Sequence, residues 1–159
     1  MCRQFRQANN FYMWTTEVSR ITTATKGQIW KLWADVPNWN VWDREVETSE
    51  LFGQFQKGSK GILKPTGGPK TKFEMTECTN FKSFTDRSFL PLCKMDFIHT
   101  MTETKDGLAI THKVVMTGFM TFLFSKVIGS KIKVGLPIAV EKLIELAEKK
   151  LKQNDKDRF

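Results

Sequence analysis

The chain has two histidines, His99 and His112, and imidazole is the side chain that most readily exchanges protons near neutral pH. Each lies in a segment with the alternating pattern of a β-strand, CKMDFIHTMTE or LAITHKVVMTG. Alternate residues of a strand face the same side of a sheet, so each histidine shares a face with apolar neighbours. These neighbours are Met95, Phe97, Met101, Ile110, Val114 and Met116. Both imidazoles are therefore predicted to point toward the interior.

The turn between these two segments decides whether the histidines meet. If residues 104–107 form the loop, His99 lies directly opposite His112. A two-residue turn at Asp106 and Gly107 would leave them diagonal on one face, and a three-residue loop would separate them.

A meeting pair of imidazoles could do two kinds of chemistry. The pair could hydrogen-bond a polar group of a ligand, or act on it as acid and base. Alternatively, two buried imidazoles are satisfied by each other, by water or by the backbone. No carboxylate or nucleophile is visibly paired with them in the sequence, which favours ligand contact over catalysis.

Neither the histidines nor the cysteines have the spacing of a metal site. Cys2, Cys78 and Cys93 form no CxxC pair, and two isolated histidines do not make a zinc site. We therefore expect no metal, no cofactor and no disulfide framework. The N-terminal segment MCRQFRQANNFYMW lacks the continuous apolar stretch of a signal peptide, which together with reduced thiols predicts a cytoplasmic protein.

The segment KSFTDRSFL leaves its inward face open. If Phe84 points inward, Asp86 and Ser88 do so too, and a buried carboxylate would need a partner such as a histidine or a ligand group. In the other phase Arg87 points inward and could meet a carboxylate ligand. We expect instead that these polar residues lie at the solvated end of the strand.

Secondary-structure signals place these segments in an α+β chain. Residues 13–21 have the pattern of a strand, and residues 23–36 that of a short amphipathic helix ended by Pro37. Trp39 and Trp42, three residues apart, predict a second and shorter helix. Six further strands joined by short turns are predicted at 46–53, 61–65, 70–78, 82–91, 93–103 and 108–118.

After Gly118 the apolar residues recur at helical spacing. Pro137 should kink this helix or divide it in two. A curved antiparallel sheet with the helix across its concave face would bury both apolar surfaces. We expect residues 1–159 to form a single domain, with 1–12 and 152–159 flexible.

Four segments taken together resemble the START-like, or SRPBCC, superfamily. They are IWKLWADVPNWNVWD, ELFGQFQKGSKGILKP, LAITHKVVMTG and GLPIAVEKLIELAEKK. The resemblance is greatest to the polyketide cyclase/dehydrase and lipid-transport branch. It implies a helix-grip fold, in which a curved seven-stranded antiparallel sheet surrounds a long C-terminal helix and two short helices lie between strands 1 and 2. It also implies a deep apolar cavity, which different members use for sterols, phospholipids, polyketides, plant hormones or quinones.

Strand alternation and the resemblance predict which residues would line such a cavity, although the same residues would also suit an ordinary core. They are Trp39, Trp42, Phe73, Met75, Phe84, Met95, Phe97, His99, Met101, Ile110, His112, Val114, Met116, Leu136 and Val140.

The formal net charge of +8 favours an anionic partner. No arginine-rich run or aromatic RNA-binding signature is present, so nucleic acid is not favoured. Residues 118–140 are apolar, but Lys126, Lys131 and Lys133 make insertion into a bilayer costly. We expect this segment to begin the long helix. Its rings, Phe119, Phe122 and Phe124, either pack under the sheet or make transient contact with an anionic membrane while ligand is exchanged.

These observations favour a protein that binds or transports a hydrophobic small molecule, such as a lipid, a quinone or a polyketide. The alternative is a polyketide aromatase/cyclase or dehydratase that uses His99 and His112 for proton transfer. A further alternative is a module that interacts with ribosomes or chaperones, for which the net charge of +8 is the only support.

Overall fold

The first part of the chain is a strand followed by two short helices. In the computed structural model, which describes residues 12–156, β1 (Met13–Thr22) is followed by α1 (Lys26–Ala34) and η1 (Val36–Val41). Thr25 caps α1: its hydroxyl oxygen accepts from the Gln28 N–H, and Gln28 Oε1 accepts from the Thr25 N–H at 2.7 Å. The predicted pair of short helices is confirmed.

Six further strands complete one antiparallel sheet. They are β2 (Val46–Phe52), β3 (Lys60–Pro65), β4 (Thr71–Thr79), β5 (Ser83–Leu90), β6 (Cys93–Thr104) and β7 (Gly107–Thr117). The strand order is β1-β7-β6-β5-β4-β3-β2, so β2 to β7 form a meander and β1 pairs with the last strand. The predicted seven-stranded sheet is confirmed.

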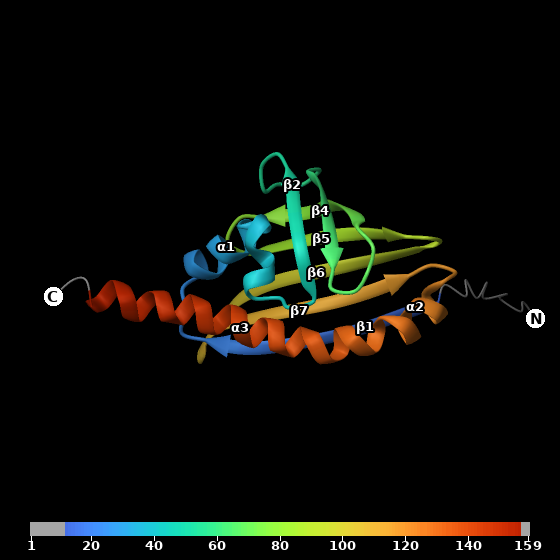
Figure 1. Cartoon of the computed structure of the whole chain (residues 1–159). Coiled ribbons are helices and arrows are strands. Elements are labelled where there is room, and N and C mark those ends of the chain that lie inside the picture. The colour runs from blue at the N-terminus through green and yellow to red at the C-terminus, as the bar shows by residue number, and fades with distance from the viewer. Residues whose placement is uncertain (1–11, 157–159) are drawn as a thin grey trace, which may run out of the picture.

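Two helices follow the sheet, α2 (Thr121–Val127) and the long α3 (Gly129–Lys156). Figure 1 shows α1 and α2 at opposite ends of the sheet and α3 running along β1 and β7. The predicted division at Pro137 does not occur, because α3 continues through it and the break lies at Ile128. Packing of the buried face of α3, which includes Val140 and Leu143, compensates for the hydrogen bond that proline removes.

The predicted flexible ends are only partly within the described residues. Residues 152–156, expected to be frayed, continue α3 as helix. Residues 1–11 and 157–159 lie outside the described part of the chain.

The largest core cluster lies between the sheet and the helices α1 and α3. Trp33 of α1 is fully buried at its centre, and its ring contacts Phe84, His99 and His112 at centroid distances of 5.3, 5.8 and 5.9 Å. Burial of large aromatic rings stabilises helices that are too short to be stable alone. The short helices therefore hold the tryptophans directly above the two histidines.

Candidate functional site

The two histidines lie opposite each other on β6 and β7. Thr104 pairs with Gly107, and this register places His99 against His112 with ring centroids 4.3 Å apart. This is the arrangement expected for a loop at 104–107. His99 is 6% exposed and His112 is 2% exposed, so both imidazoles are removed from solvent.

A cavity of about 570 Å³ lies beside the pair. Its closed end is formed by buried residues of η1 and the sheet, among them Trp39 and Ser88. Its other end reaches exposed residues of the β3–β4 loop, the β5–β6 turn and the α2–α3 region, among them Gly67, Pro91 and Lys131. The cavity therefore extends from the core to the surface.

Six of the fifteen predicted residues line this cavity, namely Trp39, Trp42, Met95, Phe97, His99 and Leu136. The other nine are buried in the core but are not among the lining residues: Phe73, Met75, Phe84, Met101, Ile110, His112, Val114, Met116 and Val140. The cavity occupies only part of the inward face of the sheet, because Trp33 covers one part of that face and side chains of α2 and α3 pack over Val114 and Met116.

The other residues that line the cavity are not in the predicted set. They are Asp43, Glu45, Val46, Leu63, residues 65–69, Thr71, Asp86, Ser88, Leu90, Pro91, Phe124, Val127, Ile128, Lys131, Ile132 and Gly135. Most belong to loops or to the ends of elements, where residue alternation carries no signal. For Asp86 and Ser88 the sequence did allow an inward orientation, in one of the two possible phases of β5.

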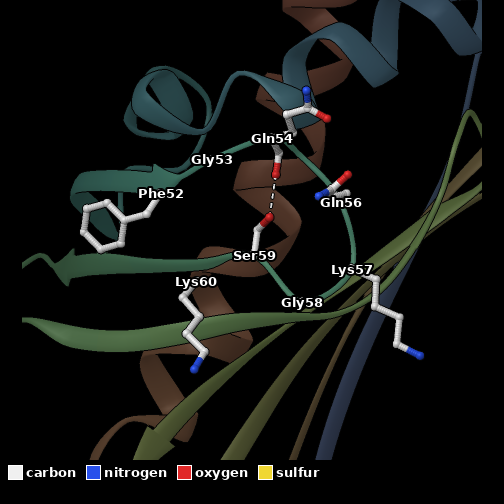
Figure 2. Close-up of a pocket in the computed structure, with 8 residues that line it drawn as sticks. All are labelled: Phe52, Gly53, Gln54, Gln56, Lys57, Gly58, Ser59 and Lys60. Carbon is white, nitrogen blue, oxygen red and sulfur yellow. Dashed lines mark hydrogen bonds between the residues drawn. The ribbon is translucent and has the colours of Figure 1, made fainter.

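A second hollow, of about 680 Å³, lies at the β2–β3 loop. Figure 2 shows that the labelled residues, from Phe52 to Lys60, belong to that one loop and the adjoining strand ends. Ser59 Oγ donates to the Gln54 carbonyl oxygen at 2.7 Å, and the surrounding side chains are mostly exposed. This hollow brings together no groups from distant parts of the chain, so we place the candidate site in the cavity beside the histidines.

The structure overturns the expectation that the polar residues of β5 lie at a solvated strand end. Phe84, Asp86 and Ser88 face inward, and Asp86 is only 3% exposed. The reason is the opposite face of the strand, where Arg87 makes a two-pronged ion pair with Asp96, with N–O distances of 2.6 and 2.8 Å. This ion pair holds Arg87 on the outer face of β5, and Phe84, Asp86 and Ser88 therefore face inward.

Asp86 lies diagonally opposite His99 on the inward face of the β5–β6 pair. The distance from Asp86 Oδ1 to His99 Nδ1 is 3.9 Å, and the Phe84 ring is stacked on the imidazole with centroids 4.0 Å apart. Burial raises the pKa of Asp86 from 3.8 to about 8. Burial also lowers the pKa of His99 to about 3 and holds that of His112 well below its usual 6.5. Near neutral pH the site therefore holds an uncharged carboxylic acid beside two uncharged imidazoles.

A second carboxyl group, that of Asp43, lines the same cavity just after η1. Its Oδ1 accepts a hydrogen bond from the Glu45 N–H at 2.9 Å. Burial raises the pKa of this group to about 6, against the lowering effect of that hydrogen bond. Two carboxyl groups thus lie near the buried end of the cavity.

Four buried nitrogens around the histidines have no hydrogen-bond partner within residues 12–156. They are Trp33 Nε1, Trp42 Nε1, His99 Nδ1 and His112 Nε2. Trp39 differs, because its Nε1 donates to the Trp33 carbonyl oxygen at 2.9 Å. Buried polar atoms are nearly always hydrogen-bonded in folded proteins, so a cluster of unpaired ones is a place where a bound molecule or ordered water would gain contacts.

Other kinds of site find less support in residues 12–156. Among them, no group of three or more histidine, cysteine or acidic side chains could hold a metal ion. No helix described in the structure is long and apolar enough to span a bilayer.

No family model and no curated protein matches the sequence. Solved structures do match the fold. The di-domain ARO/CYC StfQ from the steffimycin biosynthetic pathway aligns with a TM-score of 0.71 and 11% identity over 88% of this chain. This chain covers 52% of StfQ and so spans about half of that protein.

Two further structures align over nearly their whole length. Norcoclaurine synthase from Thalictrum flavum, a point mutant with a transition-state analogue, has a TM-score of 0.67 and 12% identity, with 87% of this chain and 96% of that one covered. A protein from Thermus thermophilus has a TM-score of 0.65 and 13% identity, with 84% and 96% covered. At these identities the likeness concerns the fold. The chain has the helix-grip fold, a seven-stranded antiparallel sheet with a long C-terminal helix.

Proposed function

We propose that this protein binds an apolar small molecule in the cavity of about 570 Å³ and carries it within the cytoplasm. The observation that supports this best is the composition of the cavity wall. Aromatic and aliphatic side chains form most of it, and a few polar groups, among them Asp86 and His99, converge at its buried end. Small-molecule sites typically have this volume and this composition. The free thiols of Cys78 and Cys93 are compatible with a reducing compartment.

The proposal predicts saturable binding of an uncharged apolar fluorophore. Phenylnaphthylamine, which is dark in water and fluoresces in apolar surroundings, should bind at one site per chain, and a lipid or quinone should displace it. The measurement is a fluorescence titration at neutral pH. Linear, non-saturating enhancement would contradict an enclosed site.

A second candidate function is proton-transfer catalysis, as the enzyme names of StfQ and norcoclaurine synthase suggest. One observation favours it: the carboxyl of Asp86 lies 3.9 Å from His99 Nδ1, and both residues line the cavity. His112, the other predicted catalytic residue, is not a lining residue and packs behind His99. An enzyme would lose turnover but keep binding in His99→Ala, whereas a carrier has no turnover to lose.

We also propose that ligand exchange takes place at an anionic membrane. The α2 surface, defined as Phe119, Phe122, Leu123, Lys126 and Val127, carries large apolar side chains that are 41–68% exposed. Val127 belongs both to this surface and to the cavity wall, so the surface adjoins the cavity opening. No acidic residue occurs between Asp106 and Glu141, while Lys126, with Lys131 and Lys133 beyond it, supplies positive charge. Exposed apolar residues flanked by lysines suit the interface of a negatively charged bilayer.

The double variant Phe122→Ser/Leu123→Ser should bind anionic vesicles about tenfold less tightly, because it removes two of the inserted side chains. The measurement is co-sedimentation with phosphatidylcholine vesicles that contain phosphatidylglycerol, and high salt should weaken wild-type binding as well. Phe52→Ser is the matched control, since Phe52 is equally exposed but belongs to β2. Equal binding to vesicles of phosphatidylcholine alone, or no effect of the double variant, would contradict the proposal.

A further inference from the structure

We propose that the buried end of the cavity is a subsite for one uncharged oxygen group, a carbonyl or hydroxyl, on the otherwise apolar ligand. This inference rests on the proposed binding function and specifies the class of ligand. Three lining residues from different elements support the proposal: Trp42 beside η1, Asp86 on β5 and His99 on β6.

These three side chains are more than nine-tenths buried, and each lines the cavity. Trp42 Nε1 and His99 Nδ1 have no hydrogen-bond partner within residues 12–156, and the nearest approach of Asp86 to that imidazole, 3.9 Å, is too long for a hydrogen bond. The indole N–H can only donate a hydrogen bond. A ligand atom that satisfies it must therefore be an acceptor.

The charges around this end disfavour an anionic ligand group. Asp43 and Asp86 both line the cavity here, and the nearby arginine, Arg87, lies on the opposite face of β5 in an ion pair with Asp96. Lys131 lines the cavity from α3, among the exposed residues of its other end. A ligand carboxylate would thus meet two carboxyl groups without a cation to balance its charge.

A cationic ligand group fits less well than an uncharged oxygen. An ammonium has no lone pair, so it would leave the Trp42 N–H unpaired. Burial, which raises the pKa of Asp86 to about 8, also means that this carboxyl carries a proton near neutral pH and can itself donate a hydrogen bond. One oxygen atom with two lone pairs can accept from both the indole and the carboxylic acid.

Four naphthalene derivatives of similar size test the inference: naphthalene, naphthol, naphthoate and naphthylmethylammonium. Binding at neutral pH is followed by calorimetry, with phenylnaphthylamine displacement as an independent readout. Naphthol should bind about tenfold more tightly than naphthalene, which corresponds to one good hydrogen bond in a buried site. Naphthoate and naphthylmethylammonium should bind more weakly than naphthalene.

Variants assign the preference to the named groups. Asp86→Leu should reduce the ratio of naphthol to naphthalene affinity to about one to threefold, since an apolar side chain cannot donate. Asp86→Asn keeps a donor of similar shape and should retain most of the preference. Trp42→Phe keeps an aromatic ring but removes the N–H, and it should reduce the ratio even if Asp86→Leu fails to fold. Asp106→Asn, in the exposed β6–β7 turn, is the control.

Each contrary outcome has a distinct meaning. Equal affinity of the wild type for naphthol and naphthalene would overturn the subsite while leaving apolar binding intact. Tightest binding of naphthylmethylammonium, lost in Asp86→Asn, would overturn it in favour of a cation site. If neither phenylnaphthylamine nor any of the four derivatives binds, the proposed function itself fails.

Discussion

The double variant Ser88→Trp/Leu136→Trp is expected to lose at least about 100-fold in affinity for phenylnaphthylamine while remaining folded. The two residues line the cavity from opposite walls, Ser88 from β5 and Leu136 from α3. Two indoles would take up much of the space that a ligand needs. Because they extend into a cavity instead of a filled core, they should cost less stability than overpacking normally does. The measurement is a fluorescence titration, paired with thermal unfolding to show that the variant folds.

The control for this variant is Thr102→Trp, which adds the same side chain at an exposed position of β6. It should bind as the wild type does. The single variant Leu136→Trp should lose about tenfold and thus lie between the two. Full affinity in a folded double variant would contradict the cavity as the binding site and would point to a surface site instead.

The free energy of unfolding is expected to fall by about 1 kcal/mol between pH 6.5 and pH 8, because the effect of Asp86 exceeds the opposite effect of the two histidines. In the unfolded chain Asp86 loses its proton near its ordinary pKa of 3.8, whereas in the folded chain it keeps the proton until about pH 8. At this carboxyl the folded state therefore binds about one more proton at pH 6.5 and about half a proton more at pH 8, so raising the pH favours unfolding. One such proton changes stability by about 1.4 kcal/mol per pH unit.

The histidines oppose this effect near and below pH 6.5, because imidazoles in the unfolded chain are half protonated at their usual pKa of 6.5. Unfolding lets His99 and His112 take up protons that the folded chain excludes, so their contribution to stability is lost as the pH falls below 6.5. Asp43, with a pKa of about 6, has lost most of its proton by pH 6.5 and contributes little to the fall. The fall between pH 6.5 and pH 8 is accordingly the effect of Asp86 reduced by the opposite effect of the histidines.

Urea unfolding at several pH values across this interval measures the slope. Asp86→Asn should abolish the fall, because the amide does not titrate, and leave a slight rise caused by the histidines, whereas Asp43→Asn should change the fall only slightly. A fall that persists in Asp86→Asn would show that another group causes it.

Residue alternation placed both histidines on the inward face of their strands, whereas the turn between the strands remained open among three lengths. The pairing of His99 with His112 followed from residue alternation and a loop at 104–107, and Gly107 supports that turn with a φ of +133° that side chains rarely adopt. The strand phase of β5 was different, since both of its faces alternate polar with apolar residues. The choice depended on Asp96 of the neighbouring strand, which holds Arg87 on the outer face.

The extent of the cavity could not be predicted from alternation. An inward side chain on β4 or β7 lines the cavity only where no helix covers it, and that depends on how α1 places Trp33 above the sheet. Val114 shows the same effect at α2 and α3: it faces inward as predicted, but it is fully buried in a second cluster against which Phe124 and Ile132 pack, and it is not a lining residue. Docking of the helices, rather than the period of the strands, divides the inward face into core and cavity.

Native mass spectrometry of freshly purified protein, followed by denaturing extraction, tests most directly whether the cavity holds a ligand. We expect one apolar molecule per chain in the wild type and none in Ser88→Trp/Leu136→Trp. Absence of an adduct, together with no thermal shift from lipids, quinones or aromatic polyketides, would contradict the proposed binding function.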